Sequence, residues 1–117
     1  MQVPLQVTFR SMAHSDALAT HVEQRAARLE HIFDPIISCH VVIELAGHHH
    51  SSGHRYRASI NLCLPGHEIV TSHGPAVDDI EDARATANRA FDEAERRLED
   101  WVQRRRGTRR DEARRST

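Results

Sequence analysis

Residues 79–106 read DIEDARATANRAFDEAERRLEDWVQRRR, the most regular stretch of the chain. Its apolar residues recur at alternating four- and three-residue steps, which is the repeat of one face of an α-helix. They are Ile80, Ala83, Ala87, Phe91, Ala94, Leu98 and Trp101. The pattern predicts one long amphipathic helix from about Asp79 to Arg106. Asp78 with Glu81 resembles a capping box, and Gly107 is expected to end the helix.

The stretches before this helix alternate with a period of two, which predicts strands. They are residues 2–10, 37–45 and 56–64, with a short fourth strand at 67–72. Pro65-Gly66 is a tight-turn signal between the last two. Residues 46–55, AGHHHSSGHR, are expected to form a polar loop that joins the second and third strands as an antiparallel hairpin.

A second helical repeat lies between the first two strands, where Leu18, Val22, Ala26 and Leu29 are in phase. Ser15 is its expected N-cap and Asp34-Pro35 its end. The order is therefore β-α-β-β-β-α. A crossover through a helix favours parallel pairing of the first two strands, whereas hairpins add antiparallel strands. This order predicts an α+β two-layer sandwich, in which two helices cover one face of a four-stranded mixed sheet.

Length and composition indicate a single globular domain. The chain has 117 residues, of which 38% are hydrophobic and 28% charged. No apolar run approaches the roughly 20 residues that span a bilayer, and no secretory pattern stands at the N-terminus. We expect a cytoplasmic protein without a membrane partner. Residues 1–107 are the expected domain, and residues 108–117 an Arg-rich disordered tail.

Cys39 keeps step with the apolar residues of its strand, whereas Cys63 is out of step with those of its own. The two thiols are expected on opposite faces of the sheet, too far apart for a disulfide.

Charge is distributed unevenly along the chain. All 16 basic residues are arginines, and from Arg104 to Thr117 seven arginines face only Asp111 and Glu112. A basic end on an acidic body predicts a polyanionic partner. A solubilising tail in a genome that prefers arginine codons is the alternative.

Pairing within the last helix is a second alternative for its arginines. Asp92 with Arg96, and Asp100 with Arg104, are acid-first pairs four residues apart, and Glu93 with Arg97 is another. Such pairs leave Arg105, Arg106, Arg109 and Arg110 with too few acids, and unpaired guanidinium groups favour phosphate.

Nothing in the sequence indicates catalysis. The chain has no G-x-S-x-G elbow, Walker loop, dinucleotide-binding glycines or H-E-x-x-H motif. We expect no enzyme activity and no cofactor.

Histidines concentrate in the expected hairpin loop, at His48, His49, His50 and His54. Consecutive histidines on a flexible loop do not preorganise a tetrahedral zinc site, so adventitious metal affinity is favoured and no metal site is assigned. Two alternatives are a specific metal site and a partly protonated tip that, with Arg55 and Arg57, touches RNA phosphate.

Together these motifs resemble the ribosome hibernation-promoting factors and ribosome-associated translation inhibitors. The resemblance covers nearly all of residues 1–107, in order. The matching stretches are MQVPLQVTFRSM (1–12), QRAARLEHIFDPIISCHVVIE (24–44), YRASINLCLPGHEIV (56–70) and NRAFDEAERRLEDWVQRRRG (88–107).

The resemblance implies a fold similar to the double-stranded RNA-binding domain. It also implies docking on the small ribosomal subunit and its ribosomal RNA, in the messenger and transfer RNA channel, with inhibition of translation during stress or stationary phase. No DNA partner is expected. Longer family members add a C-terminal dimerisation domain; we expect none here, because the sequence resembles a short form. Carried over by position, the RNA-binding residues are Arg10, Arg25, Arg28, His54, Arg55, Arg57, Arg89, Arg96, Arg97, Arg104 and Arg105.

The last helix departs from the family pattern. Ala83, Arg84 and Ala85 stand where apolar and aromatic residues are usual, and Asn88 stands at a commonly basic position. These departures bear on the strength of ribosome binding. With the acidic body, they allow an alternative: a protein-interaction or regulatory module of the same fold that no longer binds ribosomes.

Overall fold

The structure, a computed structural model, describes residues 1–49, 53–75 and 82–115. The side chains of residues 48, 49, 53, 54 and 108–115 lie outside the description. The predicted order β-α-β-β-β-α is confirmed. The elements are β1 (Gln6–Arg10), α1 (Asp16–Ile32), β2 (Ser38–His49), β3 (Gly53–Leu64), β4 (His67–His73) and α2 (Ala83–Arg115).

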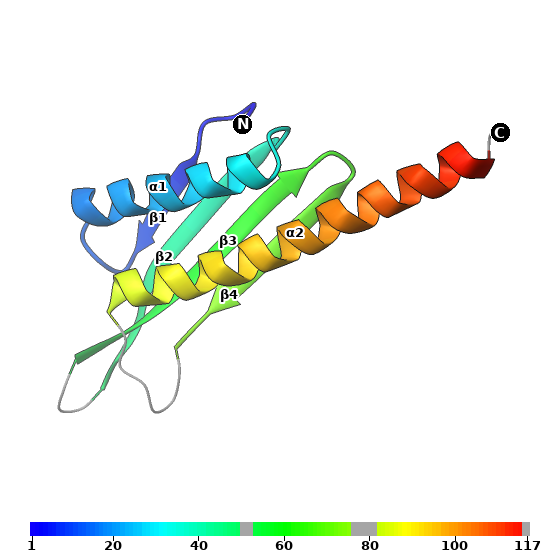
Figure 1. Ribbon diagram of the computed structural model, residues 1–117. Helices are drawn as coiled ribbons and strands as arrows, with labels where there is room; N and C mark the ends of the chain where they lie inside the picture. Colours follow the sequence, from blue (N-terminus) through cyan, green and yellow to red (C-terminus); the bar gives the residue numbers. More distant parts are fainter. Residues whose placement is uncertain (50–52, 76–81, 116–117) are drawn as a thin grey trace.

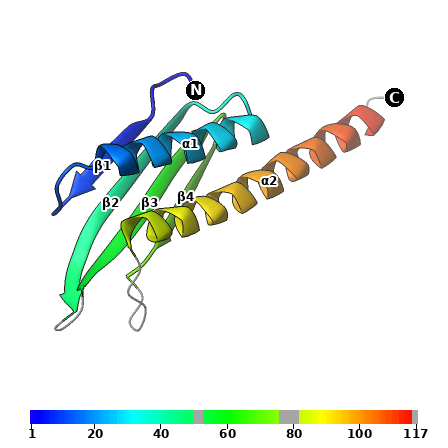
Figure 2. The ribbon, with the colours of Figure 1, turned by 60° about the vertical axis from the view of Figure 1, so that its left-hand side comes forward.

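The four strands form one mixed sheet in the order β1-β2-β3-β4. β1 runs parallel to β2, with Val7 opposite Val41, and both other pairs are antiparallel. The two helices cover the same face of the sheet, and the C-terminal half of α2 projects beyond it (Figures 1 and 2). The predicted two-layer α+β sandwich is therefore confirmed.

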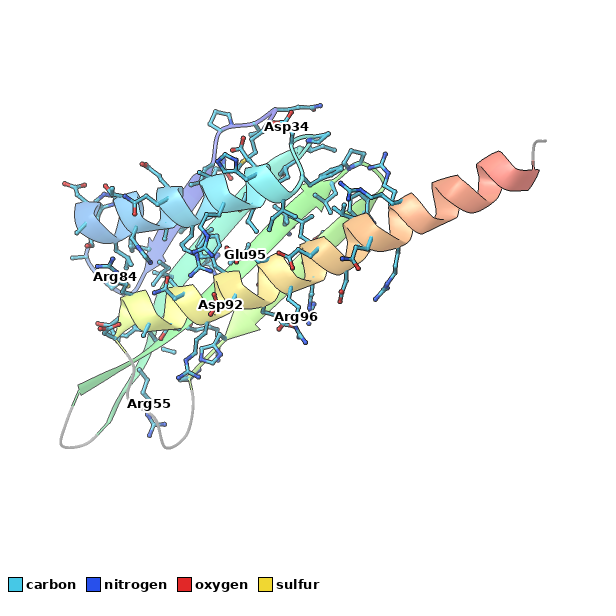
Figure 3. The ribbon with its side chains drawn as sticks, in the orientation of Figure 1. Asp34, Arg55, Arg84, Asp92, Glu95 and Arg96 are labelled. Atoms are coloured by element: carbon cyan, nitrogen blue, oxygen red, sulfur yellow. The ribbon has the colours of Figure 1, made fainter. Side chains whose placement is uncertain are left out.

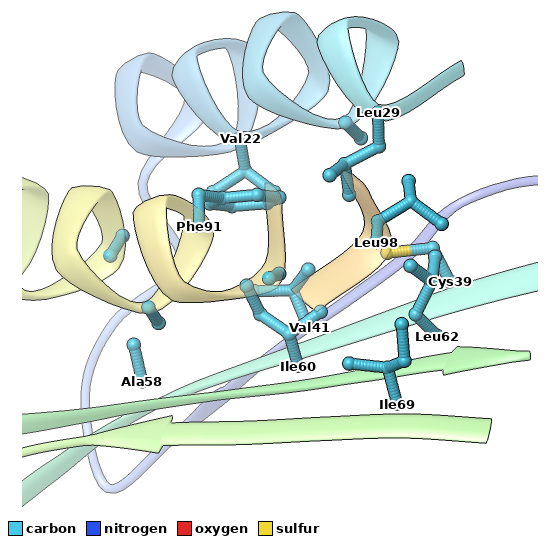
Figure 4. Close-up of a cluster of buried hydrophobic side chains, with 14 of the residues drawn as sticks. Val22, Leu29, Cys39, Val41, Ala58, Ile60, Leu62, Ile69, Phe91 and Leu98 are labelled. Atoms are coloured by element: carbon cyan, nitrogen blue, oxygen red, sulfur yellow. The ribbon is translucent and has the colours of Figure 1, made fainter. Parts of the chain in front are cut away.

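The core lies between the helices and the inward face of the sheet (Figure 4). Alternate strand residues such as Val41 and Ile60 meet Val22 of α1 and Phe91 and Leu98 of α2, and all five are buried. Each is worth roughly 1.5–3 kcal/mol relative to an exposed side chain. The faces that the sequence pattern assigned to the core are therefore the buried ones. This agreement is expected, because a segment can bury its apolar residues only if they all lie on one side.

The outward face of the sheet is polar. Thr8 Oγ1 and His40 Nε2 are 2.9 Å apart, and the Ser59 and Ser72 hydroxyls are 3.3 Å apart. Cys63 lies on this side and Cys39 is buried beneath the helices, both as free thiols, as expected. Burial raises the pKa of the Cys39 thiol to about 12, so it stays protonated at neutral pH.

Local signals set the ends of α1 and of the last hairpin. The Leu18 N–H donates to Ser15 Oγ at 3.2 Å, which confirms Ser15 as the N-cap. Gly66 has a φ of 72° in the turn between β3 and β4, as Pro65-Gly66 predicts.

The hairpin strands run farther than predicted. β2 continues to His49 and β3 begins at Gly53, so most of the expected loop 46–55 is paired strand. A register irregularity between Leu45 and Gly47 interrupts the ladder. Backbone pairing does not require an apolar face, so it continues where the helices no longer cover the sheet and the alternation stops.

β1 begins at Gln6 rather than at residue 2. Before it, the Gln2 and Val3 N–H groups donate to the carbonyls of Ile36 and Ile37 at 3.3 and 3.0 Å. Pro4 has no N–H to donate, which agrees with its place outside the ladder.

α2 begins later and ends later than predicted. It starts at Ala83 rather than Asp79, and the Ala85 N–H donates to Asp82 Oδ1 at 2.7 Å. The predicted capping box, Asp78 with Glu81, lies outside the described residues. At the other end, the helix passes through Gly107 and reaches Arg115, so the predicted end at Gly107 was wrong and residues 108–115, expected to be disordered, are helical.

The physical reason for the continuation at Gly107 is energetic. Glycine inside a helix costs about 1 kcal/mol relative to alanine, which weakens a helix without ending it. The described glycines with positive φ are Gly66 and Gly74, so Gly107 does not adopt the left-handed conformation of a C-terminal cap. Among the described residues, no helix is long and apolar enough to cross a membrane.

Candidate nucleic-acid interface

Arg25 of α1 lies between the two helices, 7% exposed. Its guanidinium donates to Asn88 Oδ1 at 2.9 Å, Asp92 Oδ1 at 2.7 Å and Glu95 Oε1 at 3.2 Å, all on α2. Two carboxylates and an amide therefore take up its charge. Arg25, for which the resemblance predicts RNA contact, lies in the structure as an interhelical contact, and its guanidinium is hydrogen-bonded to its own chain.

Arg28, one turn further along α1, shares the same acidic partner. Its Nε lies 3.3 Å from Glu95 Oε1, and the Arg28 side chain is 61% exposed. The Glu95 side chain is only 15% exposed, which anchors the pair from the α2 side. We call Arg25, Arg28, Asn88, Asp92 and Glu95 the interhelical cluster. Its two arginines face two carboxylates, so it presents little net positive charge.

His21 extends the interhelical cluster toward the start of α1. Its Nε2 lies 2.6 Å from Asn88 Oδ1, the oxygen that Arg25 also contacts. Asn88, at a position where the resemblance leads us to expect a basic residue, thus bridges His21 and Arg25 of α1.

The opposite flank of α2, which faces β4, carries a different arrangement. Arg97 Nη1 donates to the Val70 carbonyl of β4 at 2.9 Å and Arg97 Nε donates to Glu93 Oε1 at 2.9 Å. Arg96, joined to Glu93 through Oε2, is also exposed and lies on the side of α2 away from Glu95 (Figure 3). Hydrogen bonds from Arg96 and Arg97 lower the pKa of Glu93.

Arg104 lies two turns after Arg97 on the same flank and is exposed. In the part of the chain that the structure describes, it makes no hydrogen bond or ion pair, so the predicted pairing with Asp100 does not form. We call Arg96, Arg97 and Arg104 the outer arginines. They are exposed, and only the first two share a carboxylate.

A short aromatic stack stands beside the outer arginines. The rings of His67 and Trp101 are parallel within 5° with centroids 5.6 Å apart, and Phe33 meets Trp101 edge-on at 5.0 Å. The Arg105 guanidinium lies 5.2 Å from the Trp101 centroid and 5.5 Å from that of Phe33. Arg105, predicted to contact RNA, thus packs on two rings.

Arg10, Arg55 and Arg57 lie apart from this flank, whereas Arg89 lies on it, two turns before Arg96. Arg57 is paired with Glu44, 3.7 Å away, and donates to the Gly74 carbonyl at 3.2 Å. Arg55 lies at the hairpin end of the sheet (Figure 3), Arg10 is exposed at the end of β1, and Arg89 is exposed on α2. The side chain of His54 lies outside the described residues.

The ten predicted contacts whose side chains the structure describes therefore do not form one surface. They divide among the interhelical cluster, the outer side of α2 and the hairpin end. Sequence reasoning treated Trp101 only as a core residue and gave His67 no role. His67 and Trp101 meet only in the folded chain, because the turn after β3 brings residue 67 against a helix residue that lies 34 positions later in the sequence.

Metal binding has no support among the described residues, which contain no group of three or more histidine, cysteine or acidic side chains able to hold an ion. The side chains of the histidine-rich tip, His48 to His50 and His54, lie outside that description. The alternatives for this tip stay predictions.

Comparison with known proteins identifies the family. The family model described as Sigma 54 modulation protein / S30EA ribosomal protein matches residues 5–106. The chain belongs to this family. The resemblance to hibernation-promoting factors is confirmed, and the S30EA family is one of ribosome-associated proteins. The match spans every strand and both helices except the projecting end of α2.

Solved structures agree with this assignment. The N-terminal domain of Thermus thermophilus Protein Y is 27% identical, with a TM-score of 0.67 over 86% of this chain and 99% of that one. A ribosomal subunit interface protein from Coxiella burnetii is 19% identical, with a TM-score of 0.68 over 84% and 96% of the two chains, a likeness of fold alone. A comparison with curated proteins gave no match.

Proposed function

We propose that this S30EA family member binds the small ribosomal subunit through its ribosomal RNA and inhibits translation during stress or stationary phase. It acts in the cytoplasm by occupying a site, without enzymatic chemistry. The observation that supports this most is the family match over residues 5–106, which contain the whole sheet and the outer arginines.

The outer arginines supply the electrostatic part of the mechanism. Arg96, Arg97 and Arg104 project from one rigid helix, and guanidinium groups bind phosphate with two parallel hydrogen bonds. The exposed pairs of Glu93 with Arg96 and Arg97 are worth little in water and can be exchanged for phosphate contacts. Recognition of this kind depends on the shape and backbone of RNA, with little base reading.

The messenger and transfer RNA channel is the docking place that the family resemblance suggests. A rigid α+β body held there by phosphate contacts excludes messenger and transfer RNA simply by occupying their volume. That residues 1–107 act as the binding unit is part of the same proposal.

Co-sedimentation with purified small subunits tests the proposal. The protein is expected in the subunit fraction at low salt. If three phosphates are engaged, affinity falls about tenfold or more between about 50 and 200 mM salt, because counterions are released on binding.

Replacement of Arg96, Arg97 and Arg104 by glutamine should abolish most of the binding. Arg84→Gln, which changes an exposed arginine near the start of α2, is the matched control. Protein that stays at the top of a low-salt gradient with idle small subunits contradicts the proposal.

One observation favours a second candidate, a protein-interaction module. The buried Arg25 is engaged by Asp92 and Glu95, so one of the contacts implied by the family is not offered to RNA. Capture of a defined protein partner that survives nuclease treatment, together with no ribosome binding, would favour this candidate.

A further inference from the structure

The outer flank of α2 and strand β4 enclose a hollow of about 380 Å³. Its lining includes His67 and Val70 of β4 and Arg97, Trp101 and Arg104 of α2. It combines an aromatic stack with guanidinium groups, which is the chemistry that single-stranded RNA binding uses: a ring for the base and a cation for the phosphate.

His67 lines this hollow and is exposed. One face of its ring is stacked on Trp101, so a base would stack on the opposite face. Behind it, the Trp101 ring is held by Phe33 at its edge and by the Arg105 guanidinium. Because these contacts hold Trp101 in place, the platform behind His67 is already ordered, and a base stacking on it loses little further entropy.

The two arginines that line the hollow, Arg97 and Arg104, differ in their contacts with the rest of the chain. Arg97 is fixed by the Val70 carbonyl and by Glu93, so its position is preorganised. Arg104 is exposed and has no hydrogen bond or ion pair to any other residue that the structure describes. Arg104 is thus the group best able to accept a phosphate beside the His67 ring.

Two carboxylates, Glu68 and Asp100, also line the hollow. Their two negative charges balance those of Arg97 and Arg104, so the hollow does not concentrate free anions. This balance favours a ligand that gains most of its affinity from stacking and carries a single charge, and it disfavours inorganic phosphate.

We propose that this hollow is a subsite for one unstacked nucleotide of single-stranded RNA, with its base stacked on the outer face of His67 and its phosphate on Arg104. The inference rests on the proposed RNA-binding function and adds to it a single-stranded contact that phosphate binding alone does not require.

Tryptophan emission gives a test, because Trp101 is the only tryptophan of the chain and its ring stacks on that of His67. Titration of the full chain with the RNA pentamer pentaadenylate is expected to quench this emission. Inorganic phosphate at equal concentration is expected to leave the emission unchanged. His67→Ala should weaken pentamer binding about tenfold through loss of the stacking surface. His67→Phe keeps an aromatic face and should stay within about twofold of the unchanged protein. His31→Ala, an exposed histidine at the end of α1, is the matched control.

Arg104→Gln should weaken pentamer binding about fivefold without a change in the emission of the free protein. Equal pentamer affinity of His67→Ala and the unchanged protein overturns the proposal, as does quenching by inorganic phosphate alone. Weaker ribosome binding by His67→Ala with unaltered pentamer affinity also overturns it, because the hollow would then contact ribosomal protein. The proposed function is judged separately by sedimentation of the unchanged protein with small subunits, so the two can fail independently.

Discussion

On the flank of α2 that faces α1, the acidic residues Asp92 and Glu95 reach across to arginines of the other helix. On the flank beside β4, the arginines belong to α2 itself, and Arg104 makes no ion pair with an acid among the described residues. Both flanks come from one helix with alternating acids and arginines. The neighbour across the interface, rather than the residue type, therefore decides whether a guanidinium stabilises the fold or remains available to a ligand.

The largest effect is expected where the guanidinium is enclosed. Arg25→Leu keeps an apolar stem but leaves Glu95, whose side chain is 15% exposed, without one of its partners. Breaking a fully buried pair costs about 3–5 kcal/mol. Since Asp92 is 69% exposed and returns to water, we expect a loss of about 2 kcal/mol in the free energy of unfolding, measured by urea denaturation.

Arg28→Leu is the control for this prediction. The Arg28 side chain is 61% exposed, so its pair with Glu95 is screened by water and its loss should cost less than about 1 kcal/mol. If both substitutions lowered the free energy of unfolding equally, the stability that the interhelical cluster contributes would not depend on the burial of Arg25.

Charge reversal on the two flanks should separate ribosome binding from folding. Arg104→Glu is expected to lower affinity for small subunits about tenfold at low salt and to make the salt dependence shallower, because a phosphate contact is lost. Arg28→Glu makes the same change of charge on the other flank and should alter affinity by less than about threefold. Sedimentation or fluorescence polarisation measures both. A larger effect at Arg28 would move the RNA-binding surface to the interhelical side.

The smallest effect concerns Glu93, which under the proposed function competes with RNA for Arg96 and Arg97. Glu93→Gln removes the competing charge and should raise affinity about twofold. The two arginines lower the pKa of Glu93, so the pairs are intact at neutral pH. Their stabilising contribution is present above the ordinary glutamate pKa and disappears as pH falls through the lowered value. Weaker binding by Glu93→Gln would indicate that Glu93 positions the arginines for RNA.

Much of the fold was predictable because its signals are local. The phase of Val41 and Ile60 along their strands, and of Phe91 along its helix, follows from the side-chain repeat of each element alone. Ser15 and Gly66 lie where a cap and a positive φ are needed. The boundaries at Ala83, Gly107 and the hairpin end were not predictable in this way, because backbone pairing and helix propagation continue beyond the segments that the core covers.

The candidate site was less predictable, because its parts are far apart in the sequence. Arg25 and Asp92 are separated by 67 residues, and no period within either helix indicates that they meet. His67 and Trp101 lie in different elements, and neither residue by itself indicated a binding site.

The amino-acid sequence by itself determined the order of the elements, which side of each faces the core, and the abundance of arginine toward the C-terminus. These properties depend on repeats and turn residues within a few positions of one another. Only the tertiary structure decided which arginines stay available, because the approach of α1 to α2 neutralises one set while the other remains in water beside β4. Electrostatic and stacking interactions act over a few ångströms of space, so distance along the chain does not foretell them.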